Sequence, residues 1–219
     1  MSNITAESVK KLREMTGAGM MDCKSALAEA NGDFDAAIEV LRKKGLKDLA
    51  KRAGRTAAEG TIGTYVHGAG QIVAIVELNC ETDFVSKGQD FKDLARDIAM
   101  QIAAVKPLYV SREEVPANIL EKEDEIVKAT LTEAQLKSAD KILQGKRESF
   151  FKEFCLLDQA SVKDDKVTIK AMIETLSAKC GEKIVVRRFT RMEVGEGIEK
   201  RESNLADDVA ATITETRAV

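Results

Sequence analysis

The stretch TIGTYVHGAGQIVAIVELNC, residues 61–80, decides the fold of this chain. Two runs rich in β-branched residues, 61–67 and 71–80, flank the glycine-containing segment 67–70, and this pattern is typical of a β-hairpin. Residues 72–76 are apolar at every position, so we expect the second strand to be covered on both faces. The hairpin therefore predicts a sheet with a packed core around it.

Outward from the hairpin, the chain predicts a mixed core over residues 60–194. Apolar residues at helical spacing predict one amphipathic helix over about 90–105 and another over 168–180. Residues 117–158 contain two further helical segments, divided at Thr132, whose apolar residues recur by threes and fours. The expected fold class is α+β: a three-stranded antiparallel sheet packed with helices and a helical hairpin.

The third strand is expected over residues 183–194. Strict alternation places apolar residues on both faces of this strand: Ile184, Val186 and Met192 on one face, Val185 and Phe189 on the other. The helices of one chain cannot easily cover both sides of such a sheet. We therefore expect a second copy of the chain to cover the open side, which predicts a homodimer held by its core without a disulfide.

Residues 1–45 predict a separate module of three short helices. Thr5 is the expected cap of the first helix, and Gly45 is expected to end the third. Because the module has few large apolar residues, its core is only marginally stable, and we expect the module to pack against another surface. Residues 46–59 follow as a basic helical connector, whose cations either form a solvated face or bind phosphate.

The end of the chain, residues 195–219, is expected to be a tail with a short helix. Asn204 can cap that helix, and Leu205, Val209 and Ile213 lie on one side of it.

Composition and motifs exclude several classes of function. Hydrophobic residues make up 44% and charged residues 32% of the chain, values typical of a globular protein rather than a disordered one. The net charge of −3 gives no electrostatic reason to expect direct binding to nucleic acid. No P-loop occurs and no G-x-G triplet has the context of a dinucleotide site, so we expect no nucleotide or other cofactor on this chain.

The cysteines and the single histidine predict neither a metal site nor a catalytic one. Cys23, Cys80, Cys155 and Cys180 are scattered, and His67 lies at a predicted turn. Scattered thiols suit a reducing compartment, and neither a signal pattern nor an apolar run of ~20 residues occurs. We therefore expect a cytoplasmic binding protein rather than an enzyme, without a membrane span.

Two contiguous segments resemble the elongation factor Ts family of bacteria. They are LREMTGAGMMDCK, residues 12–24, and ELNCETDFV, residues 77–85. RRF at 187–189 and EVGEGIEK at 193–200 are similar to the C-terminal strand of that family and the segment that follows it. The resemblance covers essentially the whole chain.

This resemblance implies a guanine nucleotide exchange factor for the GTPase elongation factor Tu. Thr82, Asp83, Phe84 and Val85 match the turn that disturbs the Mg²⁺ site of the GTPase, where Phe84 enters an apolar pocket. From the residues alone, Phe84 is either a core side chain at the end of a strand or an exposed interface anchor. The resemblance favours the exposed anchor.

The N-terminal module is implied to contact the nucleotide-binding domain of the same GTPase. Arg13, Met20 and Met21 are the expected contact residues. From the residues alone, the adjacent methionines are either one core and one incidentally exposed side chain, or an adaptable surface for a partner. The resemblance favours the partner surface. Longer family members contain two copies of the core, and shorter ones resemble this chain and pair as homodimers. The alternative is a helical adapter of the ubiquitin-associated (UBA-like) type without exchange activity, which the three N-terminal helices alone would fit.

Overall fold

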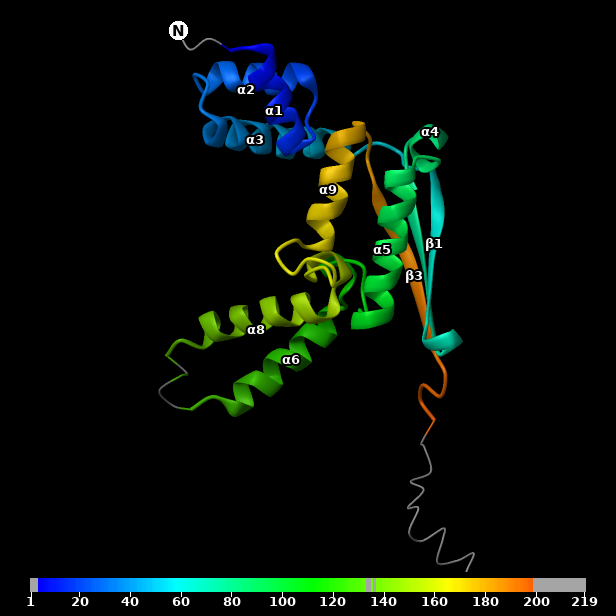
Figure 1. The fold of residues 1–219 in the computed structure, drawn as a ribbon. Coiled ribbons are helices and arrows are strands. Elements are labelled where there is room, and N and C mark those ends of the chain that lie inside the picture. The colour runs from blue at the N-terminus through cyan, green and yellow to red at the C-terminus, as the bar shows by residue number, and fades with distance from the viewer. Residues whose placement is uncertain (1–3, 133–134, 136, 199–219) are drawn as a thin grey trace, which may run out of the picture.

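The computed structural model of this protein describes residues 4–132, 135 and 137–198, and it confirms the α+β class (Figure 1). The tail helix expected from Asn204 lies outside the described residues. Three helices come first, and a sheet, its covering helices and a helical hairpin follow. No helix among the described residues has an apolar stretch long enough to cross a membrane.

The N-terminal module consists of α1 (Ala6–Thr16), α2 (Met20–Glu29) and α3 (Phe34–Arg52). Thr5 caps α1 as expected, because its hydroxyl accepts a hydrogen bond from the Ser8 N–H at 3.2 Å. The helices share a small core of their own, made by Val9, Leu12, Cys23, Ala26, Leu27 and Ala37.

The prediction that Gly45 ends the third helix is wrong. Helix α3 continues through Gly45 to Arg52, so the third helix and most of the expected connector are one element. A glycine ends a helix when its backbone turns left-handed, as Gly17 does after α1 with φ 70°. Gly45 is not among the residues with positive φ, so it remains an ordinary helical residue.

The sheet contains β1 (Glu59–His67), β2 (Ile72–Cys80) and β3 (Val185–Glu193) in the order β1-β2-β3, all antiparallel. The predicted hairpin is confirmed, with a short 3₁₀ turn, η1 (Gly68–Gly70), between its strands.

The expected alternation along the third strand is wrong beyond Val186. A bulge interrupts the pairing: Leu78 lies opposite Val186, whereas Glu77 lies opposite Arg188, so Arg187 is an extra residue. One extra residue moves every later side chain to the other face. Phe189 therefore packs against the core beside Val186, while Met192 is 68% exposed on the other side of the sheet.

Helix α5 (Gln89–Val105) covers one face of the sheet, and α9 (Ile169–Cys180) packs beside it (Figure 1). Helix α5 lies very close to β1, because a Cβ at Gly63 would come within 2.4 Å of the Ala95 carbonyl oxygen. The core is formed mainly by apolar side chains of these elements: Ala74, Val76, Leu78, Phe91, Ile98, Ile102, Ile169 and Val186.

The helical hairpin consists of α6 (Ala117–Thr130) and α8 (Ala139–Phe154), rooted by the short 3₁₀ turns η2 (Arg112–Glu114) and η3 (Leu156–Asp158). Its second helix was expected to start after Thr132; residues 133–134 and 136 lie outside the described residues, and α8 begins at Ala139.

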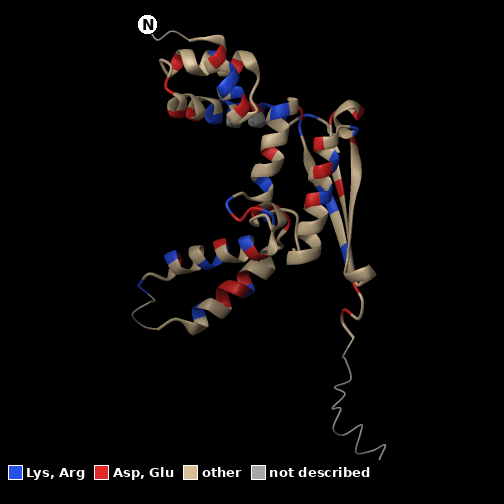
Figure 2. Cartoon of the chain, viewed as in Figure 1, with Lys and Arg blue, Asp and Glu red and all other residues tan. Residues whose placement is uncertain are grey.

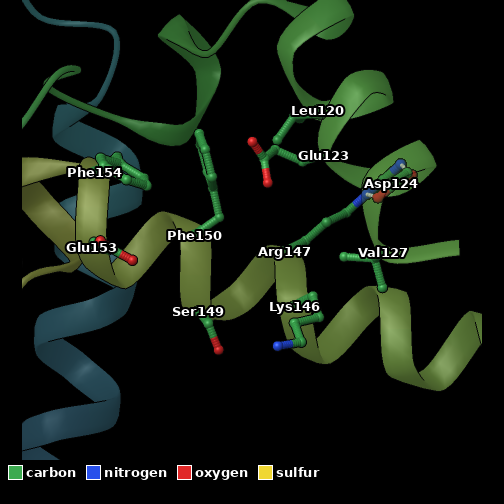
Figure 3. Close-up of a pocket in the computed structure, with 10 residues that line it drawn as sticks. All are labelled: Leu120, Glu123, Asp124, Val127, Lys146, Arg147, Ser149, Phe150, Glu153 and Phe154. Atoms are coloured by element: carbon green, nitrogen blue, oxygen red, sulfur yellow. Dashed lines mark hydrogen bonds and ion pairs between the residues drawn. The ribbon is translucent and has the colours of Figure 1, made fainter. Parts of the chain in front are cut away.

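A hollow between α6 and α8 contains both apolar and charged side chains (Figure 3). The Asp124 carboxylate pairs with the Arg147 guanidinium there, with Nε at 3.0 Å, and Phe150 lies nearby. This ion pair joins α6 to α8 across the hollow, so its role here is to hold the helical hairpin together.

Candidate functional site: the Phe84 turn and the N-terminal loop

Phe84 lies on α4 (Asp83–Ser86), a single helical turn that follows the end of β2. Its side chain is 85% exposed, the highest value among the large apolar side chains that the structure describes as exposed. The two residues after it face the protein: Val85 packs against the core and Ser86 is buried. Because successive residues of a helical turn point about 100° apart, this packing directs Phe84 outward.

Side-chain hydrogen bonds define the shape of this turn, which we call the Phe84 turn (residues 81–86). Thr82 caps α4, with its hydroxyl 3.5 Å from the Val85 N–H. That hydroxyl donates to Glu182 Oε1 at 2.6 Å, and the N–H groups of Glu81 and Thr82 donate to Glu182 Oε2, each at 3.1 Å. The turn is therefore bonded to a residue about 100 positions later in the chain.

Asp83 forms an ion pair on the outside of the same turn. Its carboxylate accepts from Lys87 Nζ at 2.6 Å, and the hydrogen bond lowers the pKa of Asp83 below its ordinary value. Both side chains are largely exposed, so solvent screens the pair and its contribution to stability is small.

The second expected contact region is the junction of α1 and α2, residues 15–21, which we call the methionine loop; it comprises the last residues of α1, the connection 17–19 and the first residues of α2. Met20 and Met21 are 44% and 72% exposed, so neither enters the core. Met15, at the other end of the loop, is 58% exposed, and sequence reasoning missed it. Thr16 lies four residues after the buried Leu12 and is itself half-buried, and this spacing leaves the adjacent Met15 outside the buried face of α1.

The base of the methionine loop is well bonded. The Thr16 hydroxyl donates to the Leu12 carbonyl at 2.7 Å and accepts from the Ala18 N–H at 3.4 Å. The buried Cys23 thiol lies 3.7 Å from the Ala18 carbonyl. Polar bonds therefore hold the backbone while the thioethers remain in solvent. Arg13 is also exposed.

The Phe84 turn and the N-terminal helices lie at the same end of the molecule, the end opposite the start of the tail (Figure 1). The connection between them is direct. Lys183 Nζ donates to the carbonyls of Ala53 and Arg55 at 2.6 and 3.0 Å, just after α3. The Arg55 guanidinium lies 3.3 Å from the Glu81 carboxylate, at the base of the turn.

The basic connector uses several of its cations internally. Arg52 donates to the Ser177 carbonyl on α9 at 3.0 Å, and Lys51 lies 3.6 Å from Asp48. Together with the Arg55 pair, these bonds favour a structural connector over a phosphate-binding one. Figure 2 shows positive and negative residues mixed along most of the helices.

The face of the sheet opposite α5 exposes apolar side chains. Ile62, Val66, Ile75 and Met192 are between 41% and 68% exposed. They lie on adjacent strands, because Val66 and Met192 both pair across from Val73, and Ile62 pairs across from Glu77. We call this surface the open face. Within the part of the chain that the structure describes, β2 is therefore covered on one side only, and the cover expected on its other side is not supplied by these residues.

A charged group lies within the open face. The Glu77 carboxylate accepts from Arg187 Nη1 at 2.8 Å and from Arg188 Nε at 2.6 Å. These two guanidiniums lower the pKa of Glu77. The bulge at Arg187 makes the double contact possible, since it brings two consecutive arginines to one carboxylate.

The described residues contain no group of three or more potential metal-ligating His, Cys, Asp or Glu side chains. Burial raises the pKa of Cys80 and of Cys155 to about 11, so both thiols stay protonated at neutral pH and are poor nucleophiles. His67 is exposed at the hairpin turn, 3.5 Å from the Tyr65 hydroxyl. What this region presents to solvent is an exposed aromatic side chain, Phe84, and the exposed methionines of the methionine loop, which are side chains suited to contact with a partner.

Comparison with known proteins agrees with this description. The family model for elongation factor TS matches residues 3–196. The chain is 56% identical over 215 residues to an elongation factor Ts of Desulforamulus reducens, covering 97% of this chain and 99% of that protein. It is 54% identical over 212 residues to proteins of the same name from Carboxydothermus hydrogenoformans and Syntrophomonas wolfei, covering 96% of this chain and 98% and 99% of theirs.

These matches define the class first: a translation elongation factor. The chain belongs to the elongation factor Ts family. Because the match to the Desulforamulus reducens protein covers 97% of this chain, it extends into the tail after residue 198.

Proposed function

We propose that this chain is a guanine nucleotide exchange factor that binds GDP-bound elongation factor Tu and accelerates the release of GDP. The proposal rests on the exposure of Phe84, a large aromatic side chain that a hydrogen-bonded turn keeps exposed to solvent. Exposing such a side chain is unfavourable in the free protein, and central aromatic residues commonly dominate interface energies. An aromatic anchor for a partner pocket accounts for both facts.

In the proposed complex, Thr82, Asp83, Phe84 and Val85 enter the GTPase next to its Mg²⁺ site. Mg²⁺ requires near-ideal octahedral geometry, so a small displacement of the residues around it weakens its hold on the nucleotide. Phe84 supplies the displacing bulk. Two other residues of the turn hold its conformation: Val85 packs against the core, and Thr82 caps α4.

The N-terminal helices are proposed to contact the nucleotide-binding domain as well, through Arg13, Met20 and Met21. Thioether side chains are flexible and adapt to irregular apolar surfaces. The location of these helices and the Phe84 turn at one end of the molecule supports a single contiguous partner surface (Figure 1).

No covalent step is part of this mechanism. The exchange factor and GDP each weaken the binding of the other by the same factor, and this reciprocity is sufficient for nucleotide exchange. The protein itself needs no bound nucleotide, metal or nucleic acid for this activity. The proposal also places it in the cytoplasm, where translation occurs and its four free thiols stay reduced.

The open face supports a second part of the proposal, that two copies of the chain form a homodimer. Exposed apolar residues on three adjacent strands form a patch of the kind that marks an interface. A twofold axis would bury the same patch on both copies, the commonest arrangement in soluble oligomers. Sheets packed face to face lie about 10 Å apart, so the side chains of two open faces can interdigitate.

The proposed exchange activity is tested by following the release of a fluorescent GDP analogue from purified elongation factor Tu in the presence of excess unlabelled GDP. We expect this protein to accelerate release many-fold, in proportion to its concentration until it saturates. Removing Mg²⁺ with a chelator should reduce the acceleration of GDP release, because the Mg²⁺ site that the Phe84 turn is proposed to disturb is then already empty. Binding without any acceleration would favour the UBA-like adapter instead.

A further inference from the structure

We propose that Glu182 is a positioning residue for the exchange reaction: its carboxylate holds the Phe84 turn in the conformation that presents Phe84 to the GTPase. This inference rests on the proposed function. Glu182 lies between α9 and β3, just after Gly181, whose φ of 76° ends α9. Nothing in its sequence neighbourhood points toward residues 81–86, so only the folded structure connects the two.

Three donors converge on this one carboxylate. The N–H groups of Glu81 and Thr82 follow the last residue of β2, and the β2–β3 ladder ends before them with Asn79 opposite Val185. Without a ladder partner, both N–H groups need another acceptor. Glu182 Oε2 accepts both at 3.1 Å, and Oε1 accepts the Thr82 hydroxyl at 2.6 Å.

The third of these bonds affects the cap of α4. A hydroxyl has one proton and two acceptor positions. Because the Thr82 proton is directed to Glu182, the oxygen is left to accept from the Val85 N–H. Glu182 therefore selects the hydroxyl orientation that caps α4, and the cap places Phe84 opposite the buried Ser86.

A reciprocal contact fixes the same corner from the other side. The Glu81 carboxylate accepts from the Lys183 N–H at 2.6 Å and pairs with Arg55, and these bonds lower the pKa of Glu81. The two segments are thus joined by reciprocal hydrogen bonds: the Glu182 carboxylate accepts from the backbone of residues 81–82, and the Glu81 carboxylate accepts from the backbone of Lys183. These side-chain bonds continue the antiparallel pairing of β2 and β3 beyond the end of the ladder.

The same corner connects the turn to the N-terminal helices. The Lys183 ammonium binds the carbonyls of Ala53 and Arg55, and the Ser177 hydroxyl bonds the Glu182 carbonyl at 2.5 Å while Arg52 binds the Ser177 carbonyl. A displacement of the Glu182 side chain therefore changes the Phe84 turn most directly. Arg52 of α3 keeps its bond to Ser177, and the segment just after α3 keeps its bonds to Lys183.

The substitution Glu182→Gln tests this role with little change in volume. The amide keeps one acceptor oxygen but presents an NH₂ group to donors, so it cannot accept all three bonds. Glu125→Gln is the matched control, because Glu125 is exposed on α6, in the helical hairpin away from the Phe84 turn (Figure 1). Two measurements are needed: residue-resolved amide hydrogen exchange of the free protein and GDP release from elongation factor Tu.

We expect the amides of residues 81, 82 and 85 to exchange at least about tenfold faster in Glu182→Gln, the factor that losing one hydrogen bond to a charged group produces. Amides of α6 should be unchanged. The maximal rate of GDP release should fall about tenfold, while the concentration for half-maximal rate changes less than about threefold, because the N-terminal contact persists. A purely structural role would leave the maximal rate unchanged wherever the protein is folded.

Other outcomes separate the possible failures. Wild-type amide exchange and a wild-type maximal rate in Glu182→Gln would overturn the positioning role, as would faster amides with an unchanged maximal rate. A wild-type protein that releases no GDP would instead overturn the proposed function. Should Glu182→Gln fail to fold, Thr82→Val removes only the hydroxyl bonds, and unchanged exchange of the Val85 amide in that variant would likewise overturn the role.

Discussion

The Phe84 turn and the open face of the sheet both expose apolar side chains, but in opposite ways. The turn presents one aromatic ring, 85% exposed, on a segment bonded through Glu182 and Thr82. The open face presents several aliphatic side chains, none more than 68% exposed, spread over three strands around the Glu77 ion pairs. A single projecting ring fits a pocket, whereas a broad flat patch fits another broad flat patch.

This difference separates two kinds of partner on one small chain. Pocket binding depends on one side chain and on the rigidity of the segment that carries it. Burial of a flat patch depends on area, so it tolerates loss of a methyl group and fails when a charge is introduced. Variants at the two surfaces should therefore affect different measurements.

The largest effect is expected from removing the N-terminal helices. Deleting residues 1–54 should reduce the acceleration of GDP release to an undetectable level, because the methionine loop is lost together with the Arg52 bond. The core should remain folded and retain the oligomeric state of the full chain, since its hydrophobic cluster is separate from that of the N-terminal module. Acceleration at the full rate by the truncated protein would show that these helices do not contact the GTPase.

A charge on the open face should halve the mass of the assembly. Light scattering at micromolar concentration should report about twice the chain mass of 23.9 kDa for the wild type, with or without reductant. Ile75→Asp should report a monomer, because Ile75 lies on the central strand and a carboxylate buried there would be unpaired. Ile126→Asp, at an exposed position of α6, is the control and should keep the wild-type mass.

A wild-type protein that is a monomer and still active would contradict the dimer and mean that the open face needs another cover. A mass that rises with added oxidant and falls with reductant would contradict an assembly without disulfides.

A moderate effect is expected at the methionine loop. The double substitution Met20→Ala and Met21→Ala should slow GDP release by about tenfold, which corresponds to roughly 1.4 kcal/mol of binding energy. Thermal stability should change little, because both side chains are already in solvent. An unchanged rate would mean that the loop lies outside the interface.

The smallest effect is expected at Asp83. Asp83→Ala should slow GDP release by only about threefold, because an exposed ion pair contributes little and Thr82 holds the turn without it. Lys87→Ala removes the other half of the pair and separates its contribution from any direct contact made by Asp83. A loss for Asp83→Ala as large as that for Phe84→Ala would make the carboxylate, rather than the ring, the main contact.

Most of the fold could be predicted from the sequence because its signals are local. The hairpin follows from its β-branched runs, α5 and α9 from helical spacing, and the start of α1 from the cap at Thr5. The bulge at Arg187 could not be predicted, because it depends on how β3 pairs with β2, which lies more than 100 residues earlier in the chain. That one extra residue turns Phe189 toward the core and Met192 toward solvent.

The candidate site was predictable only in part. The positions of Phe84, Met20 and Met21 came from motif resemblance, and the residues alone left Phe84 undecided between core and surface. Its exposure is decided by the packing of Val85 and Ser86, and the shape of the turn by Glu182, about 100 residues away. Contacts at that separation leave no local pattern in a sequence.

The role of Phe84 as the anchor is tested by the maximal rate of GDP release from elongation factor Tu with Phe84→Ala at saturating concentration. We expect a fall of about 30-fold or more, the loss typical of a central aromatic anchor, with unchanged thermal stability and unchanged mass by light scattering. Ile126→Ala, which truncates an exposed apolar side chain on α6, should behave as the wild type. A folded Phe84→Ala protein that releases GDP at the wild-type rate would contradict this role.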